Sequence, residues 1–328
     1  MFKFCLCFSL LICGVVYAQE DTAVTRLINS IDEKQPVSKP STPVFYSQKL
    51  INANTVEVLH KGILEFKVVH NFGDVAGTNG GASRFFGLDN ATDVKIAFQA
   101  GLSDKLNVIF SRTKGGGNIQ QLIETGLKYQ FLKQMDDDAK HPISVTLFAN
   151  MVVSAMKADT TSGANQLKIK EDHFNKFSDR LSQVVQLMIA KRIGKISLQL
   201  SPTYVHTNYV VTNDQKGLFA LGAAVRLPLS KKFVLIADYF HSFRSKASED
   251  ALTAQYAGFY DARRYDAFGI GVEILTPGHV FHLNFTNTTN ILENRFIPRT
   301  YTSWGKGQFR WGFTVSRDFV LFRDKKKS

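Results

Sequence analysis

The chain has 328 residues and a formal net charge of +12, and 27 of its residues are phenylalanine. The three cysteines, Cys5, Cys7 and Cys13, all lie within the first 13 residues. The remainder of the chain therefore has no disulfide, no thiolate nucleophile and no cysteine metal site. No window has about 18 uninterrupted apolar residues, which excludes a transmembrane helix, and the scattered basic residues lack the arginine-rich helix typical of nucleic-acid binding.

Residues 1–18 have the pattern of a secretory signal peptide. Lys3 gives a positive start, residues 4–16 are mostly apolar, and Val16 and Ala18 suit the −3 and −1 positions of a cleavage site. An apolar run this short does not span a bilayer as a helix. A lipoprotein signal ending at Cys13 is the alternative, although the preceding Ile12 is bulky. We expect export to the outer membrane.

Residues 19–51 are expected to be an N-terminal periplasmic linker or plug segment. Pro36, Pro40 and Pro43 stand there among many polar residues, a composition typical of linkers. Strand character begins near Val44 and becomes strong at Leu64. The expected domains are a signal peptide (1–18), this segment (19–51), an outer-membrane β-barrel (52–322) and a basic tail (323–328).

From Leu64 onward, apolar and polar residues alternate. In residues 142–156 the odd positions are apolar from Ile143 to Ala155, while even positions include Thr146 and Asn150. A period of two predicts strands with one apolar and one polar face. The expected fold is all-β, an antiparallel transmembrane β-barrel of about twelve strands. The predicted strands are 63–73, 92–101, 105–113, 119–133, 142–156, 177–192, 196–208, 217–228, 232–243, 264–275, 279–287 and 307–321.

The predicted connections alternate between long and short, as the external loops and periplasmic turns of outer-membrane barrels do. Residues 157–176 and 244–263 are long connections, whereas 193–195 is a short one. The glycine run 115–117 is the one short connection on the long side. Aromatic residues also gather near the predicted strand ends, which favours two interfacial girdles over the core of a soluble β-sandwich.

Four stretches of the chain resemble a family of uncharacterised bacterial outer-membrane β-barrels. They are LINANTVEVLHKGILEFKVVHNFG (50–73), FFGLDNATDVKIAFQAGLSDKLNV (85–108), SLQLSPTYVHTN (197–208) and GHVFHLNFTNT (278–288). The resemblance covers most of residues 44–321. It implies the barrel fold and the outer-membrane location, and it implies no mechanism.

Histidine and serine are the candidate residues for metal binding and catalysis. His279 and His282 would point to opposite faces of a strand, so they do not chelate one metal together. A lipid-modifying enzyme would need a serine activated by a histidine. Ser201 and His206 share a strand but differ in parity, and no G-x-S-x-G pattern occurs. We expect His206 to lie at the rim of the barrel.

Asp89, Asn90 and Asp93 place three oxygen-bearing side chains in a predicted external loop. Oxygen ligands of this kind suit calcium, but their spacing is not that of an EF-hand. Turns rich in aspartate and asparagine are also common before strands for local reasons. We therefore expect no metal ligand here.

The polar faces of the strands predict a lumen lined by charges of both signs. Inward aromatic and aliphatic residues, such as Phe148 and Ile236, favour a closed lumen, and no ring of one sign predicts ion selectivity. The possible lumen-lining residues are Glu65, Lys67, Lys95, Glu124, Lys128, Arg226, Asp238, Glu273 and Arg310.

The expected function is that of a non-enzymatic outer-membrane barrel, either a narrow channel or transporter for small solutes or a structural and docking element. The alternative is an outer-membrane lipid-modifying hydrolase. We expect no catalytic residue, no cofactor and no metal. The expected partners are outer-membrane lipids, lipopolysaccharide and the barrel-assembly machinery, but no nucleic acid; a solute or an envelope protein is left open as a further partner.

Overall fold

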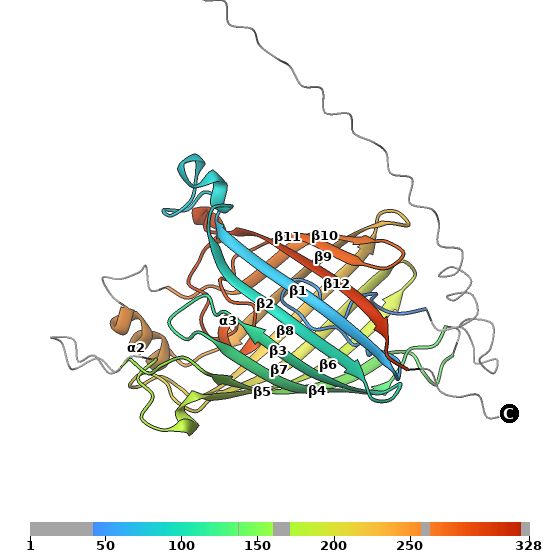
Figure 1. Cartoon of the computed structure of the whole chain (residues 1–328), viewed down its shortest axis with the longest axis horizontal. Coiled ribbons are helices and arrows are strands. Elements are labelled where there is room, and N and C mark those ends of the chain that lie inside the picture. Colours follow the sequence, from blue (N-terminus) through green and yellow to red (C-terminus); the bar gives the residue numbers. More distant parts are fainter. Residues whose placement is uncertain (1–41, 137, 160–170, 257–262, 323–328) are drawn as a thin grey trace, which may run out of the picture. The chain divides into compact units, whose positions relative to one another are not determined.

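The computed structural model describes residues 42–136, 138–159, 171–256 and 263–322. The predicted signal peptide, the linker as far as residue 41 and the basic tail lie outside these residues. The described residues form a closed antiparallel barrel of twelve strands, in which sequence neighbours pair and β1 pairs with β12 (Figure 1). The fold predicted from the alternation is confirmed.

The strand bounds lie within a few residues of the prediction. They are β1 (Ile63–Asp74), β2 (Ala91–Gly101), β3 (Leu106–Thr113), β4 (Leu122–Leu132), β5 (Ser144–Ser154), β6 (Leu181–Ile193), β7 (Ile196–Thr207), β8 (Gly217–Pro228), β9 (Phe233–Phe243), β10 (Ala267–Leu275), β11 (Val280–Thr286) and β12 (Arg310–Val320).

The strands have a buried inner face and a more exposed, mostly apolar outer face. On β5, Thr146 and Phe148 are buried, whereas Met151 is 48 % exposed. On β7, Gln199 is buried and Leu200 is 53 % exposed. Because most of the outward residues are apolar, this surface suits contact with lipid.

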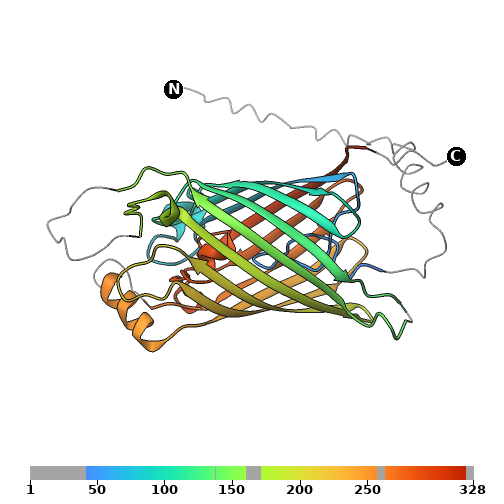
Figure 2. The same ribbon diagram turned by 90° about the horizontal axis from the view of Figure 1, so that it is seen from below.

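The long connections lie at one end of the barrel, the loop end, and the short turns lie at the other, the turn end (Figures 1 and 2). The loop end carries η1 (Ala82–Gly87), η2 (Phe177–Arg180), α2 (Lys246–Tyr256), α3 (Glu293–Phe296) and η3 (Trp304–Lys306). Among the described residues, no helix has the length and apolarity needed to cross a membrane. Predicted girdle residues are in contact at both ends, with ring centroids 4.1 Å apart for Phe285 and Trp311 and 4.9 Å apart for Tyr129 and Phe131.

The prediction of strand character from Val44 was wrong. Residues 44–62 contribute no strand to the barrel, and most of them lie inside it, as the dark blue trace in Figures 1 and 2 shows. The apolar residues that suggested a strand, such as Phe45 and Val56, are buried in the lumen. Burial against the inner wall removes their apolar surface from water, as a position on a lipid-facing strand would.

Candidate functional site

Residues 44–59 form a hairpin inside the lumen, which we call the lumen hairpin. A bridge between Lys49 and Asn54 closes it, and the Leu50 N–H donates to the Ala53 C=O at 2.8 Å. Below the tip, the Thr55 N–H donates to the Gln48 C=O at 3.1 Å. Backbone hydrogen bonds within the hairpin therefore join its two legs near the tip.

The tip of the lumen hairpin binds one carboxylate, that of Asp238. Asp238 lies midway along β9 and is buried. Its Oδ2 accepts the N–H groups of Ile51, Asn52 and Ala53 at 3.1, 2.6 and 2.9 Å. Hydrogen bonds to an ionised carboxylate are stronger than neutral ones, so Asp238 anchors the tip in the middle of the barrel.

The second leg of the hairpin, residues 54–59, binds wall residues near the turn end. Gln199 accepts the Val56 N–H at 3.0 Å and donates to the Asn54 C=O at 2.7 Å. Asn107 accepts the Leu59 N–H at 2.7 Å and donates to the Leu59 C=O at 2.9 Å. Amide side chains of the wall thus satisfy backbone groups that have no sheet partner.

A second segment fills the lumen from the loop end. Residues 287–300, which we call the lumen loop, include α3, and residues 290–300 are all buried. Glu293 of this loop forms an ion pair with Lys49 of the hairpin, and the Thr288 hydroxyl donates to Asn52 Oδ1 at 2.9 Å. The two segments therefore meet inside the barrel, where α3 is visible within the ring of strands (Figure 1).

One apolar cluster joins the hairpin, the loop and the wall. The rings of Phe296 in the lumen loop and Phe240 on β9 are 5.2 Å apart. The hairpin contributes Phe45, Leu50 and Val56 to the same cluster. The predicted inward positions Phe148 and Ile236 belong to it, as does Val205 on β7.

All nine predicted lumen-lining residues are buried in the structure. Six form three wall pairs: Glu65 with Lys67 at 2.8 Å, Lys95 with Glu124 at 2.7 Å, and Arg226 with Glu273 at 3.2 Å. Lys128 and Asp238 bind the hairpin, and Arg310 pairs with Asp74 at 2.8 Å. These charges hold one another and the hairpin, and they do not form a ring of one sign.

The glycine run of the β3–β4 connection closes over the lumen loop. The Gly116 N–H donates to Asn290 Oδ1 at 3.0 Å, and a Cβ at Gly116 would lie 2.4 Å from the Thr289 oxygen. Asp93, which sequence reasoning weighed as an oxygen ligand, accepts the N–H groups of Gly115 and Ile291 at 2.8 and 2.9 Å. Its oxygens therefore cap backbone groups, and no metal-ligating cluster occurs among the described residues.

Ion pairs at the loop end join four connections. We call Arg244, Arg295, Arg299, Glu171 and Asp214 the arginine cluster. Arg299 pairs with Glu171 and, at 2.7 Å, with Asp214; Arg295 pairs with Glu171 at 3.2 Å, and Arg244 pairs with Asp214. Burial alone would raise the pKa of Glu171, but the Arg299 and Arg295 guanidiniums lower it to about 2.

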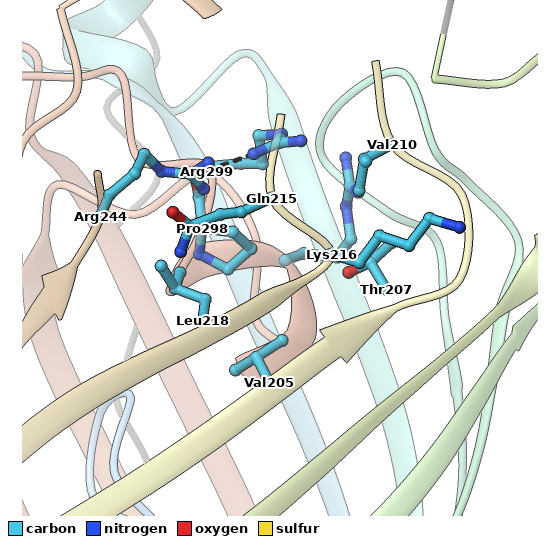
Figure 3. A pocket seen from close by; sticks show the side chains of 10 residues that line it. Val205, Thr207, Val210, Gln215, Lys216, Leu218, Arg244, Pro298 and Arg299 are labelled. Carbon is cyan, nitrogen blue, oxygen red and sulfur yellow. Dashed lines mark hydrogen bonds between the residues drawn. The ribbon is translucent and has the colours of Figure 1, made fainter. Parts of the chain in front are cut away.

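A cavity of about 10 Å³ lies beside the arginine cluster, and Figure 3 shows Arg244, Arg299 and Lys216 around it. This volume is room for about one water molecule. Sequence reasoning missed the cluster, because its members lie in connections without a periodic pattern.

The residues weighed for catalysis and metal binding are kept apart. Ser201 is buried on the inner face of β7, whereas the His206 ring stacks on Tyr204, which lies on the outer face, with centroids 6.4 Å apart. His282 is buried, with Nε2 3.2 Å from Glu273 Oε2, whereas the His279 ring stacks near Phe281. Neither pair can act as one site.

Several solved outer-membrane proteins are similar in fold to this chain, and no curated protein matches it. The NanC porin is 6 % identical, with 79 % of this chain and 100 % of that chain covered and a TM-score of 0.43. An outer membrane channel from Pseudomonas putida F1 is 13 % identical, with 80 % and 98 % covered and a TM-score of 0.43. LpxR from Salmonella typhimurium is 11 % identical, with 79 % and 99 % covered and a TM-score of 0.33. These similarities concern the fold alone.

The sequence profile of the membrane bound beta barrel domain DUF5777 matches residues 45–319. This match confirms the resemblance noted in the sequence. It begins within the lumen hairpin and ends in β12, so the hairpin belongs to the matched domain together with the strands. The chain is a member of the DUF5777 family of membrane-bound β-barrels.

Proposed function

We propose that the protein is an outer-membrane channel for small solutes, without enzymatic activity, that is closed in the described state by the lumen hairpin and the lumen loop. The observation that carries the proposal is that separable segments of chain fill the lumen. An eight-strand barrel is narrow enough for its own side chains to fill, whereas larger barrels enclose a cavity or a channel. A barrel of twelve strands filled by two inserted segments is better suited to a solute path that can open than to a rigid anchor.

The lumen hairpin is placed so that it could withdraw as one unit. The Val44 C=O accepts a hydrogen bond from Ser197, and Leu59 binds Asn107; both wall residues stand next to turns at the turn end. Only the tip reaches Asp238 in the middle of the barrel. Movement toward the turn end therefore requires no threading of a chain end through the ring.

The closed state is the stable one. Hydrogen bonds between the hairpin and Gln199 or Asn107 are each worth about 1 kcal/mol net, because water can replace them. Burial of Phe45, Leu50 and Val56 adds roughly 1.5–3 kcal/mol for each side chain. Spontaneous withdrawal is therefore rare, and opening needs a partner, a solute or a change of conditions.

The test is the conductance of the refolded mature chain in planar bilayers. The chain from residue 19 and a control chain from residue 42, which keeps the hairpin, are expected to give no steady current. A chain that starts at residue 60 and has residues 289–299 replaced by a short Gly–Ser linker is expected to conduct. Heat-dependent gel mobility reports whether each variant folds. A folded double variant that passes no current would contradict the channel and favour the structural and docking role.

A further inference from the structure

The arginine cluster holds more positive than negative charge. Among the described residues, its three guanidiniums face two carboxylates, and the exposed Lys216 lines the same cavity. All three arginine side chains are at least nine-tenths buried. Positive charge is costly to bury, so the buried guanidiniums at this end of the lumen are suited to bind anionic groups.

Two guanidiniums also have donors to spare. Arg244 Nε and Arg295 Nε are buried and have no hydrogen-bond partner among the described residues. Both arginines line the cavity. A buried donor without a partner loses its hydration and gains nothing in return, which makes these atoms ready to bind an acceptor.

The carboxylates already present show which ligand chemistry fits. A guanidinium is a planar fork of donors that matches the two oxygens of a carboxylate. Arg299 is bound by Glu171 from the β5–β6 connection and by Asp214 from the β7–β8 connection. The cavity of about 10 Å³ admits no solute beside them, so an incoming carboxylate must displace one of the two.

We propose that the arginine cluster is a binding site for anionic solutes that carry a carboxylate, and that Glu171 and Asp214 occupy this site as internal competitors. A bound solute displaces one internal carboxylate and frees the connection that carries it from the lumen loop. The inference rests on the proposed function and names the class of solute that the channel would take.

The experiment uses the refolded mature chain in detergent, with acetate as the probe and its neutral isostere acetamide as the control, at constant ionic strength. In Glu171→Gln an internal competitor is gone, so acetate is expected to raise Tm saturably and by more than in the wild type. Acetamide is expected to leave Tm unchanged. Asp136→Asn is the matched control, because Asp136 pairs with Arg192 at the turn end, away from the cluster.

An equal response to acetate in Glu171→Gln, Asp136→Asn and the wild type overturns the proposal. If Glu171→Gln does not fold, the same comparison of Tm with and without acetate is made with Asp214→Asn, which removes the other internal carboxylate. The conductance of the variant without the lumen hairpin and the lumen loop is measured in the absence of acetate. The channel hypothesis and the carboxylate-site hypothesis are therefore tested separately, and either one can be contradicted without the other.

Discussion

Asn52, at the tip of the lumen hairpin, binds Asp238 through both its backbone and its side chain. Its N–H lies 2.6 Å from Oδ2, and its Nδ2 lies 2.8 Å from Oδ1. The residues are 186 positions apart in the sequence, yet their contact fixes how deep the hairpin reaches. Asp238 is therefore the wall residue whose change should loosen the hairpin most.

Asp238→Asn keeps the shape of the side chain but removes its charge and one acceptor oxygen. The one remaining oxygen can accept the N–H groups of residues 51–53 only if the new NH2 group faces Asn52 Nδ2. At least one hydrogen bond is therefore lost, at roughly 1–3 kcal/mol, and the others go to a neutral acceptor. We expect hydrogen exchange of these amides to become about tenfold faster or more. Asp266→Asn, at a half-buried side chain that binds Tyr239 and lies away from the hairpin, is the control. Unchanged protection at residues 51–53 would show that Asp238 is not the anchor.

The lipid-facing side of β7 predicts that the cost of a charged substitution depends on its depth in the membrane. Leu200, 53 % exposed, lies near the middle of the strand, and Ile196, 42 % exposed, is its first residue on the same face. Leu200→Arg should reduce the free energy of unfolding by roughly 2–4 kcal/mol, and Ile196→Arg by about 0–1 kcal/mol. Urea unfolding in lipid vesicles measures both. Equal losses at the two positions would contradict a membrane midplane near Leu200.

The low pKa of Glu171 predicts an acid limit for the arginine cluster. The pKa is about 2 in the folded chain and 4.5 ordinarily, so its ion pairs contribute fully above about pH 4.5. That contribution, about 3 kcal/mol, is lost as the pH falls through 2. The free energy of unfolding should therefore decline more between pH 5 and pH 2 in the wild type than in Glu171→Gln. Parallel pH curves would rule out this role for Glu171.

The packing of the β3–β4 connection against the lumen loop can be tested by comparing alanine substitutions at two neighbouring glycines. A Cβ at Gly116 would lie 2.4 Å from the Thr289 oxygen, whereas at Gly117 its nearest contact is 3.9 Å away. Gly116→Ala should cost about 1–3 kcal/mol and increase proteolysis within residues 287–300, and Gly117→Ala should do neither. If both variants resist protease like the wild type, the β3–β4 connection does not hold the loop.

The wall of the barrel could be predicted because a period of two repeats in every strand. Leu200 and Gln199 differ in polarity, and that difference alone assigns them to opposite faces. The same pattern placed Glu124 and Lys95 inside, where they pair.

The filling of the lumen could not be predicted in this way. Phe45 and Val56 carry apolar side chains that are equally compatible with a strand, and no periodicity distinguishes burial by lipid from burial by a wall. Glu171 and Asp214 meet through Arg299 although each lies in a different connection. Contacts of this kind depend on which loops bend inward, and the local sequence does not encode that.

The two segments that fill the barrel precede, in the sequence, the two strands that close it. The lumen hairpin leads into β1, the lumen loop leads toward β12, and β1 and β12 form the final seam. The pairing along this seam, from Ile63 with Val320 to His70 with Phe313, encloses the lumen hairpin and the lumen loop within the ring of strands. Ring closure and the exclusion of water from the interior therefore depend on the same two stretches of the chain.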